Sequence, residues 1–78
     1  MPIVIYGATP PIAPGTFFTI CLEEPPSAVG TVTFTGEPAD CTPPSLDFPK
    51  GDNCTKMMMP DCKKLTAHSA GHPDKVLR

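Results

Sequence analysis

The chain has 78 residues with 12 prolines, 6 glycines and a net charge of −2. A chain of this length forms one small domain, and such domains commonly need disulfides, a metal or a partner chain for stability. Hydrophobic residues make up 40% of the sequence, which is too many for an intrinsically disordered chain. No basic cluster interleaved with aromatic residues indicates nucleic-acid binding. These limits favour a β-rich domain with many turns.

The N-terminal residues 1–14 are predicted to form an extended arm. Pro2–Tyr6 is a short apolar run typical of an edge strand, where a proline at the first position is tolerated. The proline-rich residues 8–15 favour an extended, polyproline-like conformation. This part of the arm either lies on the surface of another molecule or acts as a stiff linker.

Two strand-like runs, Thr16–Leu22 and Thr31–Thr35, form the predicted centre of the domain. Alternate residues point to opposite sides of a strand, so each run has one clearly apolar side. The residues on these sides are Phe18, Ile20 and Leu22 in the first run, and Val32 and Phe34 in the second. We expect the two runs to pair as an antiparallel hairpin across residues 23–30.

Two further strands are predicted at Ser45–Phe48 and Cys54–Met59, separated by a turn over residues 49–53. They complete a β core over residues 15–60. In the C-terminal part, residues 61–78, Asp61 is a candidate N-cap and Gly71 a candidate C-terminal residue of a helix, followed by a tail over residues 75–78. The sequence therefore predicts a mostly β fold: a small antiparallel sheet or sandwich with proline-rich arms and at most one short C-terminal helix.

The four cysteines are Cys21, Cys41, Cys54 and Cys62, an even number that is typical of a disulfide framework in a short chain. A disulfide between Cys41 and Cys54 would close a loop around the third strand. Loop-closure entropy gives such a bond roughly 3 kcal/mol of stability. Cys21 lies within a predicted strand and is a candidate core residue.

A zinc site is the alternative interpretation of the C-terminal cysteines. Its candidate ligands are Cys54, Cys62, His68 and His72. The spacing of the two histidines suits a zinc finger, whereas the seven residues between the cysteines exceed the usual two to four. We therefore expect no metal and no other cofactor. No motif for catalysis is present, so we expect a protein without enzymatic activity.

Met1–Tyr6 lacks the basic residues and the long apolar run of a signal peptide, and no stretch is long and apolar enough to span a bilayer. We therefore expect a chain that is made in the cytoplasm of a host cell and has no membrane partner. Disulfides form in oxidising compartments. A particle that assembles inside a cell and then leaves it reconciles both expectations.

Small size, proline-rich segments and the lack of a catalytic motif lead to the hypothesis of a structural protein that binds a larger assembly. A decoration or cement protein of a virion, such as a phage capsid, fits best, and a homo-oligomer is a further hypothesis. Alternatives are a small zinc-binding module and a secreted, disulfide-stapled binding protein. The candidate contact residues are Ile3, Val4, Ile5, Tyr6, Pro10, Pro11, Ile12, Pro14, Met57, Met58, Met59, Val76 and Leu77.

Overall fold

The computed structural model describes residues 3–22, 30–48 and 53–78, and it confirms the prediction of a mostly β domain. The elements in the described ranges are β1 (Ile3–Tyr6), β2 (Phe17–Leu22), β3 (Gly30–Glu37), the 3-10 turn η1 (Ala39–Cys41), β4 (Leu46–Phe48), β5 (Cys54–Met58), β6 (Lys64–His68) and β7 (Lys75–Val76).

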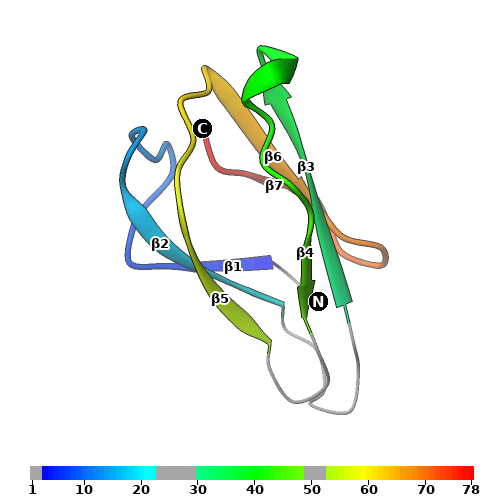
Figure 1. Cartoon of the computed structure of the whole chain (residues 1–78). Coiled ribbons are helices and arrows are strands. Elements are labelled where there is room, and N and C mark those ends of the chain that lie inside the picture. The colour runs from blue at the N-terminus through cyan, green and yellow to red at the C-terminus, as the bar shows by residue number, and fades with distance from the viewer. Residues whose placement is uncertain (1–2, 23–29, 49–52) are drawn as a thin grey trace.

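The strands form two antiparallel sheets that face each other (Figure 1). One sheet has the order β1-β2-β5 and the other the order β4-β3-β6-β7. Grouping the first, second and fifth strands against the third, sixth and seventh is the arrangement of immunoglobulin-type sandwiches. In constant-type immunoglobulin domains the fourth strand joins the first group, whereas here β4 pairs with β3. The domain is therefore a β-sandwich.

The core lies between the two sheets because each contributes one apolar side. In β3, Val32 and Phe34 are buried and the intervening threonines are exposed, as the strict alternation predicts. In β2, alternation likewise turns one set of apolar residues inward. The buried core residues are Ile3, Ile12, Phe18, Ile20, Leu22, Val32, Phe34, Phe48, Met59, Cys62, Leu65, Ala67 and Leu77.

The predicted hairpin between the two central runs is wrong, although both runs are strands. β2 pairs with β1 and β5, whereas β3 pairs with β4 and β6 in the other sheet. Both strands carry an apolar side, and those sides face each other across the core instead of lying side by side in one sheet. Residues 23–29, which make up most of the predicted connecting loop, lie outside the described residues, as do residues 49–52 of the second predicted turn.

The predicted C-terminal helix is also wrong. β6 occupies Lys64–His68 and pairs with β3, with Leu65 and Ala67 fully buried between the sheets. Gly71 has a φ of 80°, but it serves the turn that leads from β6 into β7. The predicted tail contains β7, which pairs with β6. Burial of one side of an alternating segment outweighs the helix-capping signals.

The N-terminal arm is part of the domain. β1 pairs with β2 at the edge of one sheet, as predicted for an edge strand. Beyond the cis Pro10–Pro11 bond, Ile12 is 1% exposed, and its N–H donates to the carbonyl of Leu77 beside the other sheet (2.8 Å). The proline-rich segment therefore connects both sheets and is not an arm that reaches outward.

All four cysteines form disulfides, but not in the predicted pairing. Cys21 bonds to Cys54, and Cys41 bonds to Cys62, so the predicted Cys41–Cys54 bond is wrong. The register of β2 and β5 places Cys21 directly opposite Cys54. Cys41 ends the turn η1 that follows β3, and Cys62 precedes β6, the neighbour of β3. Strand pairing, rather than distance along the sequence, selects the partners.

Candidate functional site

The outer side of the β1-β2-β5 sheet, here called the apolar face, is built from three rows of directly opposite residues. The first row joins Val4, Cys21 and Cys54, the second joins Tyr6, Thr19 and Lys56, and the third joins Phe17 and Met58. These side chains share one side because directly opposite residues of an antiparallel pair point the same way. The alternate residues of the same strands face the core.

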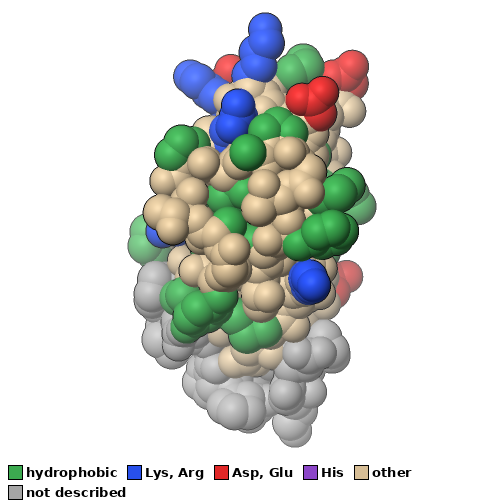
Figure 2. Space-filling model, turned by 90° about the vertical axis from the view of Figure 1, so that its left-hand side faces the viewer, with side chains coloured by type: hydrophobic (Ala, Val, Ile, Leu, Met, Phe, Trp, Pro, Cys, Tyr) green, Lys and Arg blue, Asp and Glu red, His purple; other side chains and the backbone are tan. Residues whose placement is uncertain are grey.

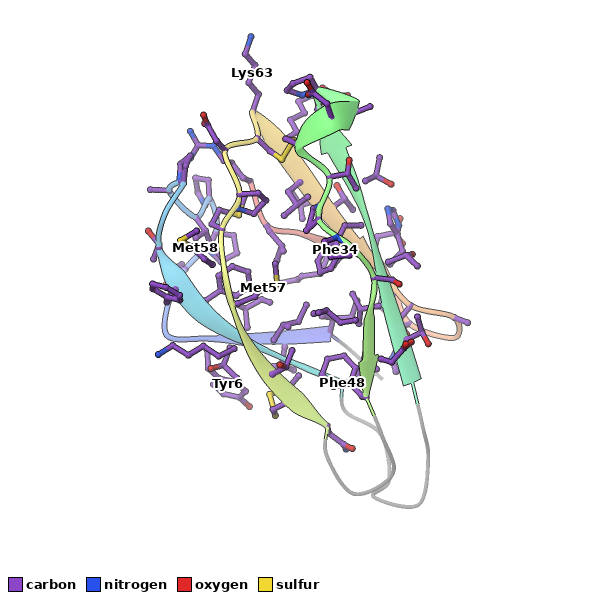
Figure 3. All side chains as sticks on the ribbon, in the orientation of Figure 1. Tyr6, Phe34, Phe48, Met57, Met58 and Lys63 are labelled. Carbon is purple, nitrogen blue, oxygen red and sulfur yellow. A yellow bond between two sulfur atoms is a disulfide. The ribbon has the colours of Figure 1, made fainter. Side chains whose placement is uncertain are left out.

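Large hydrophobic side chains are exposed on this face. Tyr6 is 54% exposed, Phe17 is 58% exposed and Met58 is 52% exposed. Tyr6 and Met58 lie on the outer side of the sheet, while Phe34 and Phe48 point into the core (Figure 3). In Figure 2, hydrophobic side chains are spread over the middle of the molecule, and charged side chains gather toward its upper end. Aromatic residues and methionine are the types enriched at protein interfaces.

Lys56 is the one charged side chain among those described on the apolar face. Its Nζ lies 5.3 Å from the centroid of the Phe17 ring, within the range of a cation–π contact. Lys56 is exposed, and its ammonium group lies over the Phe17 ring, so the aliphatic part of the lysine extends the apolar surface. The face therefore combines apolar contact area with one positive charge.

The structure separates the predicted contact residues into exposed, intermediate and buried sets. Tyr6, Met58, Val76, Pro11 and Pro14 are exposed, whereas Val4, Ile5, Pro10 and Met57 are intermediate. Ile3, Ile12, Met59 and Leu77 are 0 to 3% exposed core residues, so their prediction as contact residues is wrong. They are buried because they form the inward sides of strands and of the segments that close the sandwich.

Phe17 and Lys56 were not predicted as contact residues. The sequence did contain a signal for Phe17, because strand alternation places it opposite the apolar set of the same run. Lys56 carries no such signal, since its place beside Phe17 depends on the pairing of β2 with β5. Sequence reasoning missed the site because it is assembled from three strands that are distant in the chain.

The outer side of the other sheet is polar. Thr31 donates to the carboxylate of Asp47 (3.0 Å), and the hydroxyl of Ser69 donates to the carbonyl of Thr31 (2.8 Å). Thr35 Oγ1 lies 2.8 Å from His68 Nε2, and His68 Nδ1 lies 2.9 Å from Asp74 Oδ1. A shallow depression beside this network is lined by Thr31, Thr33, His68, Ser69 and Ala70.

The order Thr35–His68–Asp74 resembles the hydroxyl–imidazole–carboxylate chain of serine hydrolases. Catalysis of that kind also needs oriented donors for an oxyanion in a site that excludes water. Here the side chain of His68 is 34% exposed and that of Asp74 is 63% exposed, on the open side of a sheet. We interpret the chain of hydrogen bonds as a stabilising network that links β3, β6 and the approach to β7.

The candidate zinc ligands are not brought together. Cys54 and Cys62 belong to two different disulfides, so neither offers a free thiolate to a metal. His68 is engaged with Thr35 and Asp74. Among the described residues, no group of three or more histidine, cysteine, aspartate or glutamate side chains is arranged to hold a metal ion. The described residues therefore do not assemble this alternative zinc set.

Within the described parts of the chain, no helix is long and apolar enough to cross a membrane. No family model, curated protein or solved structure matches this chain. The geometry of the sandwich is therefore the basis for a functional proposal.

Proposed function

We propose that the protein is a non-enzymatic binding domain that attaches to a larger protein assembly through its apolar face. The observation that carries this proposal is the joint exposure of Tyr6, Phe17 and Met58 on one sheet of a small domain. Burying such side chains against a partner removes apolar surface from water, at about 25 cal/mol per Å². Aromatic side chains of this kind are also the residue types that dominate binding energy at interfaces.

The chemistry of the face defines the partner. It fits a protein surface that is largely apolar and carries a carboxylate positioned to meet Lys56, the one charge among the described side chains of the face. A carboxylate there would form a charge-assisted hydrogen bond with the ammonium group. A highly charged partner surface is disfavoured, because its charges would be desolvated against apolar side chains.

A cement or decoration role on a virion is the form of this function that we favour. A stable attachment domain for a particle outside the cell must remain folded without chaperones, and the two disulfides support that requirement. The rigid β-sandwich presents its contact residues on strands, which lowers the entropy lost on binding. A secreted binding protein is the second candidate, and the same two disulfides favour it.

A double variant of two exposed residues tests the proposal. The Phe17→Ser and Met58→Ser double variant is expected to bind its native assembly roughly 30-fold more weakly or worse, the effect of losing one interface hot spot. Both side chains are more than half exposed, so the fold is retained. The measurement is the fraction of tagged protein that sediments together with particles or complexes isolated from its source.

The matched control is Val76→Ser. Val76 is also an exposed hydrophobic residue (60% exposed), but it lies on the opposite sheet, beside Thr66 of β6. We expect its substitution to leave retention unchanged. Equal retention of the wild type and the double variant, or a loss caused by Val76→Ser alone, would contradict binding through the apolar face. Deletion of residues 1–14 is not a suitable test, because it removes core residues Ile3 and Ile12.

A further inference from the structure

The Cys21–Cys54 disulfide lies on the apolar face. Its two cysteines are directly opposite each other on the neighbouring strands β2 and β5, with Cα atoms 4.1 Å apart. Cys21 is 4% exposed, but Cys54 belongs to the edge strand β5 and is exposed. One of the two cysteines of this bond is therefore exposed to solvent.

The Cys41–Cys62 disulfide is enclosed. Cys62 is 2% exposed and Cys41 is partly buried. The backbone of β3 covers the two sulfur atoms so closely that a Cβ atom at Gly36 would lie 2.9 Å from the Sγ of Cys41 and 3.2 Å from the Sγ of Cys62. The domain thus holds one accessible and one shielded disulfide.

Thiol–disulfide exchange requires a thiolate to reach a sulfur atom of the bond, so its rate depends on access. We infer that the Cys21–Cys54 bond is a site of exchange with an external dithiol, and that its cleavage loosens β5 and thereby controls the apolar face. The second half of this inference, control of binding, rests on the proposed function. The exchange itself does not.

The exchange proceeds in two steps. A thiolate of the external dithiol attacks the Sγ of Cys54, the bond to Cys21 breaks, and Cys21 leaves as a thiolate that takes up a proton. The second thiolate of the reagent then attacks the reagent's own sulfur in the mixed disulfide and releases Cys54. The reagent loses two electrons and becomes a disulfide, while the protein disulfide gains these electrons. The two protons of the reagent end on Cys21 and Cys54.

Cleavage affects the apolar face because β5 carries part of it. β5 supplies Lys56 and Met58 and lies at the edge of its sheet, where β2 is its one neighbour among the described strands. Without the disulfide, the strand is held by its ladder with β2 and by the burial of neighbouring Met59. Edge strands with fewer constraints open more often. The position of Met58 relative to Phe17 then becomes less well defined.

Timed reduction of the oxidised protein tests this inference. The protein is treated with dithiothreitol under native conditions, samples are quenched with iodoacetamide, and the labelled peptides are quantified by mass spectrometry. We expect Cys21 and Cys54 to be labelled about tenfold faster or more than Cys41 and Cys62. The rate should rise linearly with dithiothreitol concentration, as direct attack requires. Equal labelling rates for the two disulfides would contradict selective exchange at Cys21–Cys54. A labelling rate that reaches a plateau set by unfolding would contradict direct attack on the folded protein.

Hydrogen exchange of the selectively reduced and alkylated protein tests the consequence. Amides of β5 are expected to exchange faster than in the oxidised protein, while those of β6 (Lys64–His68) remain unchanged and serve as the internal control. Unchanged exchange in β5 would overturn control of the apolar face. Because neither measurement uses the partner, failure of the proposed function would leave both results unaffected.

Discussion

Replacing Cys41 and Cys62 together by alanine is expected to lower the free energy of unfolding by about 3 to 4 kcal/mol. The disulfide joins residues 21 positions apart, for which loop-closure entropy gives about 3 kcal/mol. Removing the buried sulfur of Cys62 adds roughly 1 kcal/mol, the order for one buried methylene. Since small domains have total stabilities of about 5 to 15 kcal/mol, this is a large part of the whole.

The loss is measured by urea denaturation of the oxidised wild type and of the double variant. Asp40→Ala is the matched control, because Asp40 is exposed in the same turn η1 and does not contribute to the bond; its effect should stay within about 0.5 kcal/mol. An unchanged urea midpoint in the double variant would show that the Cys41–Cys62 bond does not constrain the fold.

The second large effect is expected at Phe18. This side chain is 2% exposed on the inward side of β2, opposite Met57 of β5. Phe18→Ala is expected to cost about 3 to 5 kcal/mol, because it removes a large aromatic group and leaves a cavity in a small core. Urea or thermal denaturation of the purified variant measures this loss.

The neighbouring residue provides the control. Phe17 is the same residue type one position earlier in the same strand, but it is 58% exposed. Phe17→Ala should cost about 1 kcal/mol or less, mainly through its contact with Lys56. A strand shifted by one residue would exchange the two faces. Equal losses, or a larger loss for Phe17, would therefore contradict the register of β2.

The fold could be predicted where a local residue pattern determines which side chains of a strand are buried. The alternation of Thr31–Thr35 correctly places Val32 and Phe34 in the core and the threonines outside. The same rule separates Phe18 from Phe17 in β2. Both burial assignments require only the two-residue alternation of side chains that is intrinsic to a strand.

Sheet membership could not be predicted in the same way. Both central runs are strands, yet pairing β2 with β5 and β3 with β6 depends on contacts between residues far apart in the chain. The same long-range pairing selects the disulfides, so the correct partner of Cys54 is the distant Cys21 and not Cys41. Four cysteines allow three connectivities, and the sequence contains nothing that chooses among them.

The C-terminal segment shows how local signals can compete. Asp61 and Gly71 are placed where a helix would begin and end, but Leu65 and Ala67 also alternate with polar neighbours. Such capping signals contribute about 1 kcal/mol each, whereas β6 gains burial on one side and hydrogen bonds with two strands. Tyr6 and Met58 were predicted as contact residues, and both are exposed, but that they share one face with Phe17 and Lys56 depends on strand pairing, which the sequence does not show.

Site-specific photocrosslinking most directly tests the claim that the protein binds through its apolar face. A photoreactive phenylalanine analogue is placed at position 58 in one variant and at position 76 in another, since Met58 and Val76 are similarly exposed on opposite sheets. After binding to the native assembly, irradiation is expected to link the partner to position 58 and not to position 76. Crosslinking from position 76 alone, or equally from both, would contradict the proposed binding surface.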